Sequence, residues 1–232
     1  MLSFLKQSNK NLYDLSIKLI IITIIASMFV FYRVIHLDSL SYIFLIWNIF
    51  LAWLPFYFSL IYTNRKFKLK YCQYIFGLLW LVFYPNAPYM LTDFIHLSNY
   101  KFCETKAFGK VFISNFNIWY DFFLISIFVI IGLVLSFVSL SVMHKYIKEK
   151  YNHVLGLIFI FTISMLSGFA IYLGRFIRLN SWEFATNPTR LINVVFSNFN
   201  LQALRFTLLF GSLTLIFYVT FFLMNKYHSQ NS

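Results

Sequence analysis

The side chains best suited to acid and base chemistry lie in two short stretches of the sequence. Asp93 and His96 are spaced i,i+3, a spacing that places both on one face of a helix. Asp121 follows Trp119 and Tyr120 directly before a long apolar stretch. Carboxylates and imidazoles can transfer protons as general acids and general bases. The candidate catalytic residues are therefore Asp93, His96 and Asp121.

A metal ion held by the same side chains is the alternative chemistry, and the sequence argues against it. His36 is the one other histidine near His96, and neither a CxxC pair nor a Cys/His zinc spacing occurs. A P-loop, an HExxH motif and a GxSxG motif are also missing, which removes the reactions that they serve. We predict no metal site and name no cofactor. Cys72 and Cys103 are expected to be free thiols.

A second polar group follows residue 174 and has the chemistry to bind an anion. Arg175 and Arg178 are spaced i,i+3, and guanidinium groups bind phosphate or carboxylate through two hydrogen bonds. Alternatively, these arginines extend to the membrane surface or pair with nearby carboxylates. Asn48 and Asn86 are expected at similar depths, where their amides could meet across two helices. The candidate binding residues are Asn48, Asn86, Arg175, Arg178, Asn180, Trp182 and Glu183.

The elements that must position these side chains are membrane-spanning helices. The 232 residues are 60% hydrophobic and 11% charged, whereas a soluble domain carries roughly 25% charged residues. The apolar blocks match the roughly 20 helical residues that cross a hydrocarbon core. A soluble fold is excluded, and we predict one all-α, polytopic membrane helix bundle over residues 1–232. The six expected spans lie near residues 15–35, 40–62, 71–91, 120–141, 154–174 and 203–224.

The third of these spans is expected to break at Pro85-Asn86-Ala87-Pro88. The two prolines remove two backbone donors and push the preceding residues out of helical geometry. Asn86 could then cap a short second helix. A break inside the membrane requires protein or a water-filled cavity to satisfy the freed backbone groups. The alternative is a simple proline kink at the membrane boundary.

The distribution of charge predicts the orientation. Eleven of the 19 Lys and Arg residues fall on the side of the amino terminus, four of them in the short loop 63–70. Because cytoplasmic loops are enriched in Lys and Arg, both termini should be cytoplasmic. Five of the seven carboxylates then lie outside. The long connections 92–118 and 175–202 are also outside, with a short helix after Pro188 lying on the outer leaflet. Asp121 is expected at the start of the fourth helix, where the macrodipole stabilises negative charge.

Four stretches of the sequence resemble one family. They are Trp47-Asn-x-Phe-Leu-Ala-Trp53, Pro85-Asn-Ala-Pro-Tyr-x-Leu-Thr-Asp-Phe-x-His96, Trp119-Tyr-Asp121 and Gly174-Arg-Phe-x-Arg-x-Asn-Ser-Trp-Glu183. The first stretch extends to Pro55 and the second to Leu97. Together the four stretches resemble the bacterial multi-pass membrane proteins grouped as domain of unknown function 1361, over residues 40–215. The resemblance implies a location in the bacterial inner membrane and supplies no activity.

Three hypotheses of function stay open. In the first, a polar cluster facing out of the cytoplasm binds or processes an anionic or lipid-linked substrate. In the second, the protein is a small-solute transporter or channel that uses the broken third span, although no inverted repeat is visible. In the third, it is a non-catalytic assembly or lipid-binding protein whose cluster is a salt-bridge network. In each case the protein's partner is the lipid bilayer. The net charge of +12 comes from residues between the apolar blocks, as membrane topology requires, so it does not indicate binding of nucleic acid.

Overall fold

The computed structural model describes residues 10–37, 40–64, 70–106 and 109–231. Within them, six helices are long and apolar enough to cross a membrane, which confirms the predicted all-α, polytopic class. They are Lys10–His36, Phe44–Tyr62, Gln73–Asn99, Phe116–Lys150, His153–Ile177 and Leu201–Tyr227. Cys103 is exposed and free, as expected. Residues of the charge argument that lie outside the described ones are Lys6, Asp38, Arg65, Lys66 and Lys68, and the same holds for the side chain of Cys72.

The chain divides into two compact units. Unit 1 combines Met1–Ile49 with Asp93–Ile131, and unit 2 combines Phe50–Thr92 with Gly132–Ser232. The boundary falls inside three elements, which are α3 (Phe44–Tyr62), the 3-10 helix η1 (Met90–Asn99) and α6 (Phe116–Lys150). Each unit has its own packing and its own group of polar side chains.

Unit 1 pairs α2 (Lys10–Leu37) with the first part of α6. The Tyr120 hydroxyl donates a hydrogen bond to the carbonyl of Phe29 at 2.7 Å, and the rings of Phe29 and Phe123 meet edge to face. A hairpin of β1 (Cys103–Lys106) and β2 (Gly109–Phe112) precedes α6, with Cys103 opposite Phe112. The sequence did not predict this hairpin, because four-residue strands are too short to show an alternating pattern.

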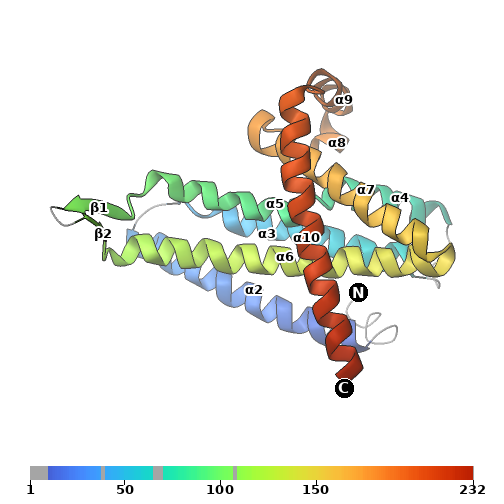
Figure 1. The fold of residues 1–232 in the computed structure, drawn as a ribbon, viewed down its shortest axis with the longest axis horizontal. Coiled ribbons are helices and arrows are strands. Elements are labelled where there is room, and N and C mark those ends of the chain that lie inside the picture. The colour runs from blue at the N-terminus through green and yellow to red at the C-terminus, as the bar shows by residue number, and fades with distance from the viewer. Residues whose placement is uncertain (1–9, 38–39, 65–69, 107–108, 232) are drawn as a thin grey trace. The chain divides into compact units, whose positions relative to one another are not determined.

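Unit 2 contains α4 (Lys70–Phe83), α5 (Asn86–Tyr89), α7 (His153–Tyr172), the π-helix η2 (Leu173–Ile177), α8 (Glu183–Thr186), α9 (Pro188–Ser197) and α10 (Leu201–Asn231). Figure 1 shows α10 crossing α7. Two glycines, Gly168 and Gly211, bring the backbones of these helices close together. A Cβ atom on Gly168 would lie 2.4 Å from the carbonyl oxygen of Thr207 and 2.5 Å from the nitrogen of Gly211. Small residues permit this close approach of two helices.

The third span breaks where the prolines predicted. Helix α4 ends at Phe83, α5 begins at Asn86, and the chain then continues as η1. The expected cap is wrong, because Pro85 occupies the N-cap position and Asn86 lies inside α5. Asn86 instead donates its side-chain nitrogen to the Phe83 carbonyl at 2.9 Å, because the Ala87 nitrogen donates to Tyr84 and leaves that carbonyl available. Protein groups therefore satisfy the backbone at the break.

Two pairs of buried polar side chains lie next to the core of unit 2. Trp80 donates its indole N–H to Ser139 at 2.8 Å, and Tyr84 and Ser136 share a hydrogen bond of 3.0 Å. Both pairs join the broken span to α6, next to an apolar core that includes Leu140, Ile160, Ile163 and Tyr218. Pairing removes the cost of burying these polar atoms in an apolar interior.

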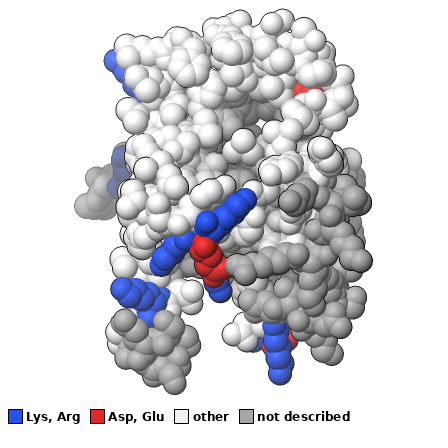
Figure 2. All heavy atoms as spheres, turned by 90° about the vertical axis from the view of Figure 1, so that its right-hand side faces the viewer, with Lys and Arg blue, Asp and Glu red and all other residues white. Residues whose placement is uncertain are grey.

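The outer surface of the helices is apolar, as lipid contact requires. Large side chains on α2 such as Ile21, Met28 and Phe31 are about half exposed or more. A monomeric soluble protein rarely exposes such contiguous apolar surface. Figure 2 shows only a few Lys, Arg, Asp and Glu side chains on the face that it presents, among uncharged atoms. The surface therefore agrees with the six membrane-spanning helices.

Candidate functional site

Asp121 lies in a buried ion pair with an arginine that the sequence did not single out. Arg33 donates from Nε to Oδ1 of Asp121 at 2.5 Å and from Nη2 to Oδ2 at 2.9 Å. The two residues are 5% and 1% exposed. The expectation that Asp121 begins a helix is wrong, because α6 starts at Phe116 and no acidic residue occupies its first turn. The partner of the carboxylate is therefore the Arg33 guanidinium and not the helix macrodipole.

Two tyrosines complete this group in unit 1. The Tyr100 hydroxyl donates to Oδ2 of Asp121 at 2.6 Å, and the Arg33 guanidinium carbon lies 4.1 Å from the centre of the Tyr42 ring. Tyr42 precedes the α3 span, and its burial raises the pKa of its hydroxyl, with a hydrogen bond to Tyr100 and the nearby Asp121 charge acting in the same direction. Tyr42 therefore stays neutral. The Asp121 carboxylate meets three donors, which is the environment of a structural anchor.

Asp93 and His96 lie in the same unit and have different partners. Asp93 is buried and accepts a hydrogen bond from the side-chain nitrogen of Asn48 at 3.0 Å. The His96 ring packs against the Phe44 ring with centroids 4.4 Å apart. Both residues belong to η1, and a 3-10 helix has three residues per turn, so their i,i+3 spacing aligns them on one face. In the part of the chain that the structure describes, no three His, Cys, Asp or Glu residues are grouped to hold a metal ion.

Arg175 is held in a defined orientation within unit 2. Its Nε and Nη2 both donate to the hydroxyl of Thr92, at 2.9 and 2.5 Å, and its guanidinium carbon lies 4.6 Å from the centre of the Tyr89 ring. Arg175 belongs to η2, the π-helical turn that ends the fifth span. Single π-helical turns inside α-helices occur often at functional sites.

Arg178 has an unusual backbone conformation. It follows η2 with φ 60° and ψ 38°, and it is the one residue other than glycine with positive φ among the described residues. A left-handed conformation costs an L-residue about 1–2 kcal/mol, so glycine usually occupies this position after a helix. The side chain is exposed, and no ion pair or hydrogen bond of its guanidinium group occurs within the described ranges. A strained arginine with an accessible charge is a functional candidate.

Glu183 organises the loop after Arg178. It is buried, and its Oε1 accepts hydrogen bonds from the Asn180 backbone nitrogen at 3.0 Å and side-chain nitrogen at 3.3 Å. Its Oε2 lies 2.7 Å from Nη1 of Arg190 on α9. Asn86 donates to the Ser181 hydroxyl at 2.9 Å, which joins this loop to the broken span. Glu183 and Asn180 therefore fix the loop, while Trp182 is exposed.

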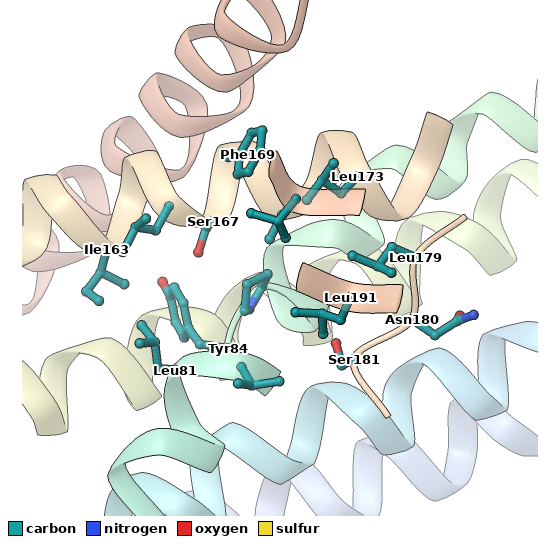
Figure 3. A pocket seen from close by; sticks show the side chains of 15 residues that line it. Leu81, Tyr84, Ile163, Ser167, Phe169, Leu173, Leu179, Asn180, Ser181 and Leu191 are labelled. Atoms are coloured by element: carbon teal, nitrogen blue, oxygen red, sulfur yellow. The ribbon is translucent and has the colours of Figure 1, made fainter. Parts of the chain in front are cut away.

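A cavity of about 250 Å³ lies beside this loop, entirely within unit 2. Its walls come mainly from apolar side chains on α4, α7 and α9, as Figure 3 shows for Leu81, Phe169 and Leu191. Asn180 and Ser181 of the loop border it, together with Ser167 and Tyr84. Leu191 and Val195 belong to α9, the short helix expected after Pro188. The sequence could not predict this cavity, because its walls come from helices far apart in the chain.

The structure thus divides the candidate residues between the two units. Asn48, Asp93, His96 and Asp121 belong to unit 1, whereas Asn86, Arg175, Arg178, Asn180, Trp182 and Glu183 belong to unit 2. The side-chain nitrogens of Asn48 and Asn86, expected to serve an amide pair, donate to Asp93 and to Phe83 and Ser181. Arg33, Tyr42 and Tyr100 were missed. For Arg33 the sequence does hold one signal, an arginine inside a predicted apolar span.

Comparison with known proteins gives a family and no activity. Neither the curated proteins nor the solved structures contain a match to the chain. A family model described as protein of unknown function, DUF1361, matches residues 47–217, which include the broken span, the Asp121 stretch and the Arg178 loop. This match covers most of the chain, and the protein therefore belongs to the DUF1361 family.

Proposed function

We propose that this protein binds an anionic amphiphile of the membrane, with the charged head at Arg178 and the apolar part in the cavity of unit 2. The carrying observation is the apolar cavity bordered by Leu179, Asn180 and Ser181, the three residues that directly follow the strained, exposed Arg178 in the chain. Pockets for small ligands combine apolar walls with a few well-placed polar groups. A guanidinium group on the residue next to such a border can select a phosphate or carboxylate head.

The same proposal includes the side of the membrane. We place both termini in the cytoplasm of a bacterial cell and the Arg178 loop at the outer leaflet, on the count of Lys and Arg residues. Helix α9 supports this arrangement, because an amphipathic helix is suited to the interface between lipid and water. Asp93 and His96 stay candidates for acid and base chemistry on the bound ligand. Asp121 is assigned to structure, because Arg33 and Tyr100 engage both of its oxygens.

Replacing Arg178 with glycine should separate binding from folding. Glycine adopts φ 60° without strain, so the thermal stability of Arg178→Gly should equal or exceed that of the wild type. Binding of dioleoylphosphatidylglycerol should weaken about tenfold or more, since a hydrogen bond to a charged group contributes about 1.5–3 kcal/mol. Affinity is measured in detergent by native mass spectrometry or lipid titration.

The matched lipid is dioleoylphosphatidylcholine, which has the same chains and no net charge. The wild type should prefer phosphatidylglycerol, and Arg178→Gly should lose this preference. Arg205→Ala serves as the control variant. Arg205 is an exposed arginine of the same unit, so its replacement removes the same charge. Equal affinity of the wild type for both lipids, or an unchanged preference in Arg178→Gly, would contradict the proposal.

A further inference from the structure

We infer that the ligand in this cavity is an ester-linked acyl lipid, whose carbonyl oxygen accepts a hydrogen bond from Ser167. This inference rests on the proposed function and specifies the chemical class of its ligand. Ser167 is 1% exposed and lines the cavity. Figure 3 shows its hydroxyl directed from α7 toward the space between the lining side chains.

The Ser167 hydroxyl has no hydrogen-bond partner within the described residues. Serine and threonine in helices ordinarily donate to a backbone carbonyl of the preceding turn. Ser126 and Thr214 of this chain do so, to Phe122 and Phe210. A buried hydroxyl without a partner costs free energy, so each such group in a native protein calls for an explanation. An acceptor supplied by the ligand would remove this cost.

The surroundings of Ser167 restrict that acceptor to a neutral group. Its neighbours on the wall include Ile163, Leu166 and Ala170, all apolar. A charge at this position would lose its hydration without compensation. An ester carbonyl is a neutral acceptor, whereas an isoprenyl or alkyl ether chain offers no carbonyl. The neutral acceptor and the apolar walls together favour an acyl ester.

The distance along α7 also agrees with this class of lipid. Ser167 precedes Gly174 by seven residues, about 10 Å at 1.5 Å per residue, so it lies deeper than the loop that carries Arg178. In a glycerophospholipid the ester groups likewise lie between the phosphate and the hydrocarbon chains. Leu81 and Leu166 line the cavity and are 39% and 48% exposed, so its wall reaches the lipid-facing surface of the helices. A chain can therefore enter from the bilayer.

The test compares two phosphatidylglycerols with the same head group and chain length, one ester-linked and one ether-linked. The full-length wild type in detergent should bind the ester lipid about three- to tenfold more tightly, the contribution of one net hydrogen bond. Ser167→Ala should bind both lipids equally, at the affinity of the wild type for the ether lipid. Ser167→Thr, which retains the hydroxyl, should retain the preference.

Ser164→Ala is the matched control variant. Ser164 is also a buried serine of α7 whose hydroxyl lacks a partner among the described residues, but it does not line the cavity. Its replacement should leave the ester preference unchanged. Equal binding of ester and ether lipids by the wild type would overturn the inference, and so would an equal loss in both serine variants. If the proposed function itself is wrong, the wild type should show no preference for phosphatidylglycerol over phosphatidylcholine. That result is distinct from the two outcomes that overturn the ester inference.

Discussion

Asparagine in place of Asp121 should destabilise the protein by about 3–5 kcal/mol, the effect of removing one partner from a buried ion pair. The variant leaves the Arg33 guanidinium buried without a countercharge, and Arg33 is only 5% exposed. It also removes the charge that the Tyr100 hydroxyl contacts at 2.6 Å. Thermal or denaturant unfolding of the purified protein in detergent measures the loss.

The exposed carboxylate Glu104 offers the matched control. It lies in β1 of the same unit and is solvent-accessible, so Glu104→Gln should change stability by less than about 0.5 kcal/mol. The double variant Arg33→Met/Asp121→Leu should recover much of the loss, because apolar residues of similar volume often replace a buried ion pair without cost. A stable Asp121→Asn protein would contradict the structural role and return Asp121 to the catalytic candidates.

This distinction changes how functional experiments on the polar cluster should be interpreted. Loss of a cellular phenotype in Asp121→Asn would follow from unfolding alone. Arg178 differs from Asp121 in this respect, because it occupies a backbone position that glycine fills at lower cost. Variants of Arg178 therefore test function more directly.

Local sequence chemistry predicted the membrane-spanning helices and the break in the third one, but not which side chains contact each other. Pro85 and Pro88 break the third span because a missing backbone donor acts within a few residues. The short helix expected after Pro188 is found as α9, Pro188–Ser197, because helical periodicity is also local. In contrast, Arg33 and Asp121 are 88 residues apart, and Asn86 and Ser181 are 95 residues apart. Which side chains pair at such separations depends on how the helices pack. The spans have similar apolar compositions, so no short stretch of sequence shows how they pack.

In the candidate site, too, the sequence did not show the backbone conformation of a single residue, Arg178. In the sequence, Arg175 and Arg178 are spaced i,i+3 and are both candidates for binding one anion. The chain changes conformation between them, so Arg175 is fixed by Thr92 and Arg178 follows the π-helical turn in a left-handed conformation. Position 178 is arginine and not glycine, the residue that usually signals a left-handed turn after a helix. The two arginines therefore have different roles despite a regular spacing.

Alanine in place of Gly168 should have the second-largest effect, a loss of about 1–3 kcal/mol or more, typical of overpacking. The added Cβ would lie 2.4 Å from the Thr207 carbonyl oxygen, which belongs to the backbone of α10 and cannot move alone. The two helices must separate along their crossing, and contacts on both sides of it are lost. Unfolding in detergent reports the change.

Two other glycines provide a graded series. A Cβ on Gly211 would meet the flexible Met165 side chain at 3.0 Å and its Cα at 3.1 Å, so Gly211→Ala should cost less than Gly168→Ala. A Cβ on Gly174 would meet only the Tyr89 ring edge, at 3.3 Å, and the Leu179 carbonyl at 3.6 Å, so Gly174→Ala should cost least. Equal losses at all three positions would contradict close backbone contact as the cause. Because Ser167 precedes Gly168 on α7, a displaced crossing should also reduce the ester preference, whereas Gly174→Ala should leave the crossing intact.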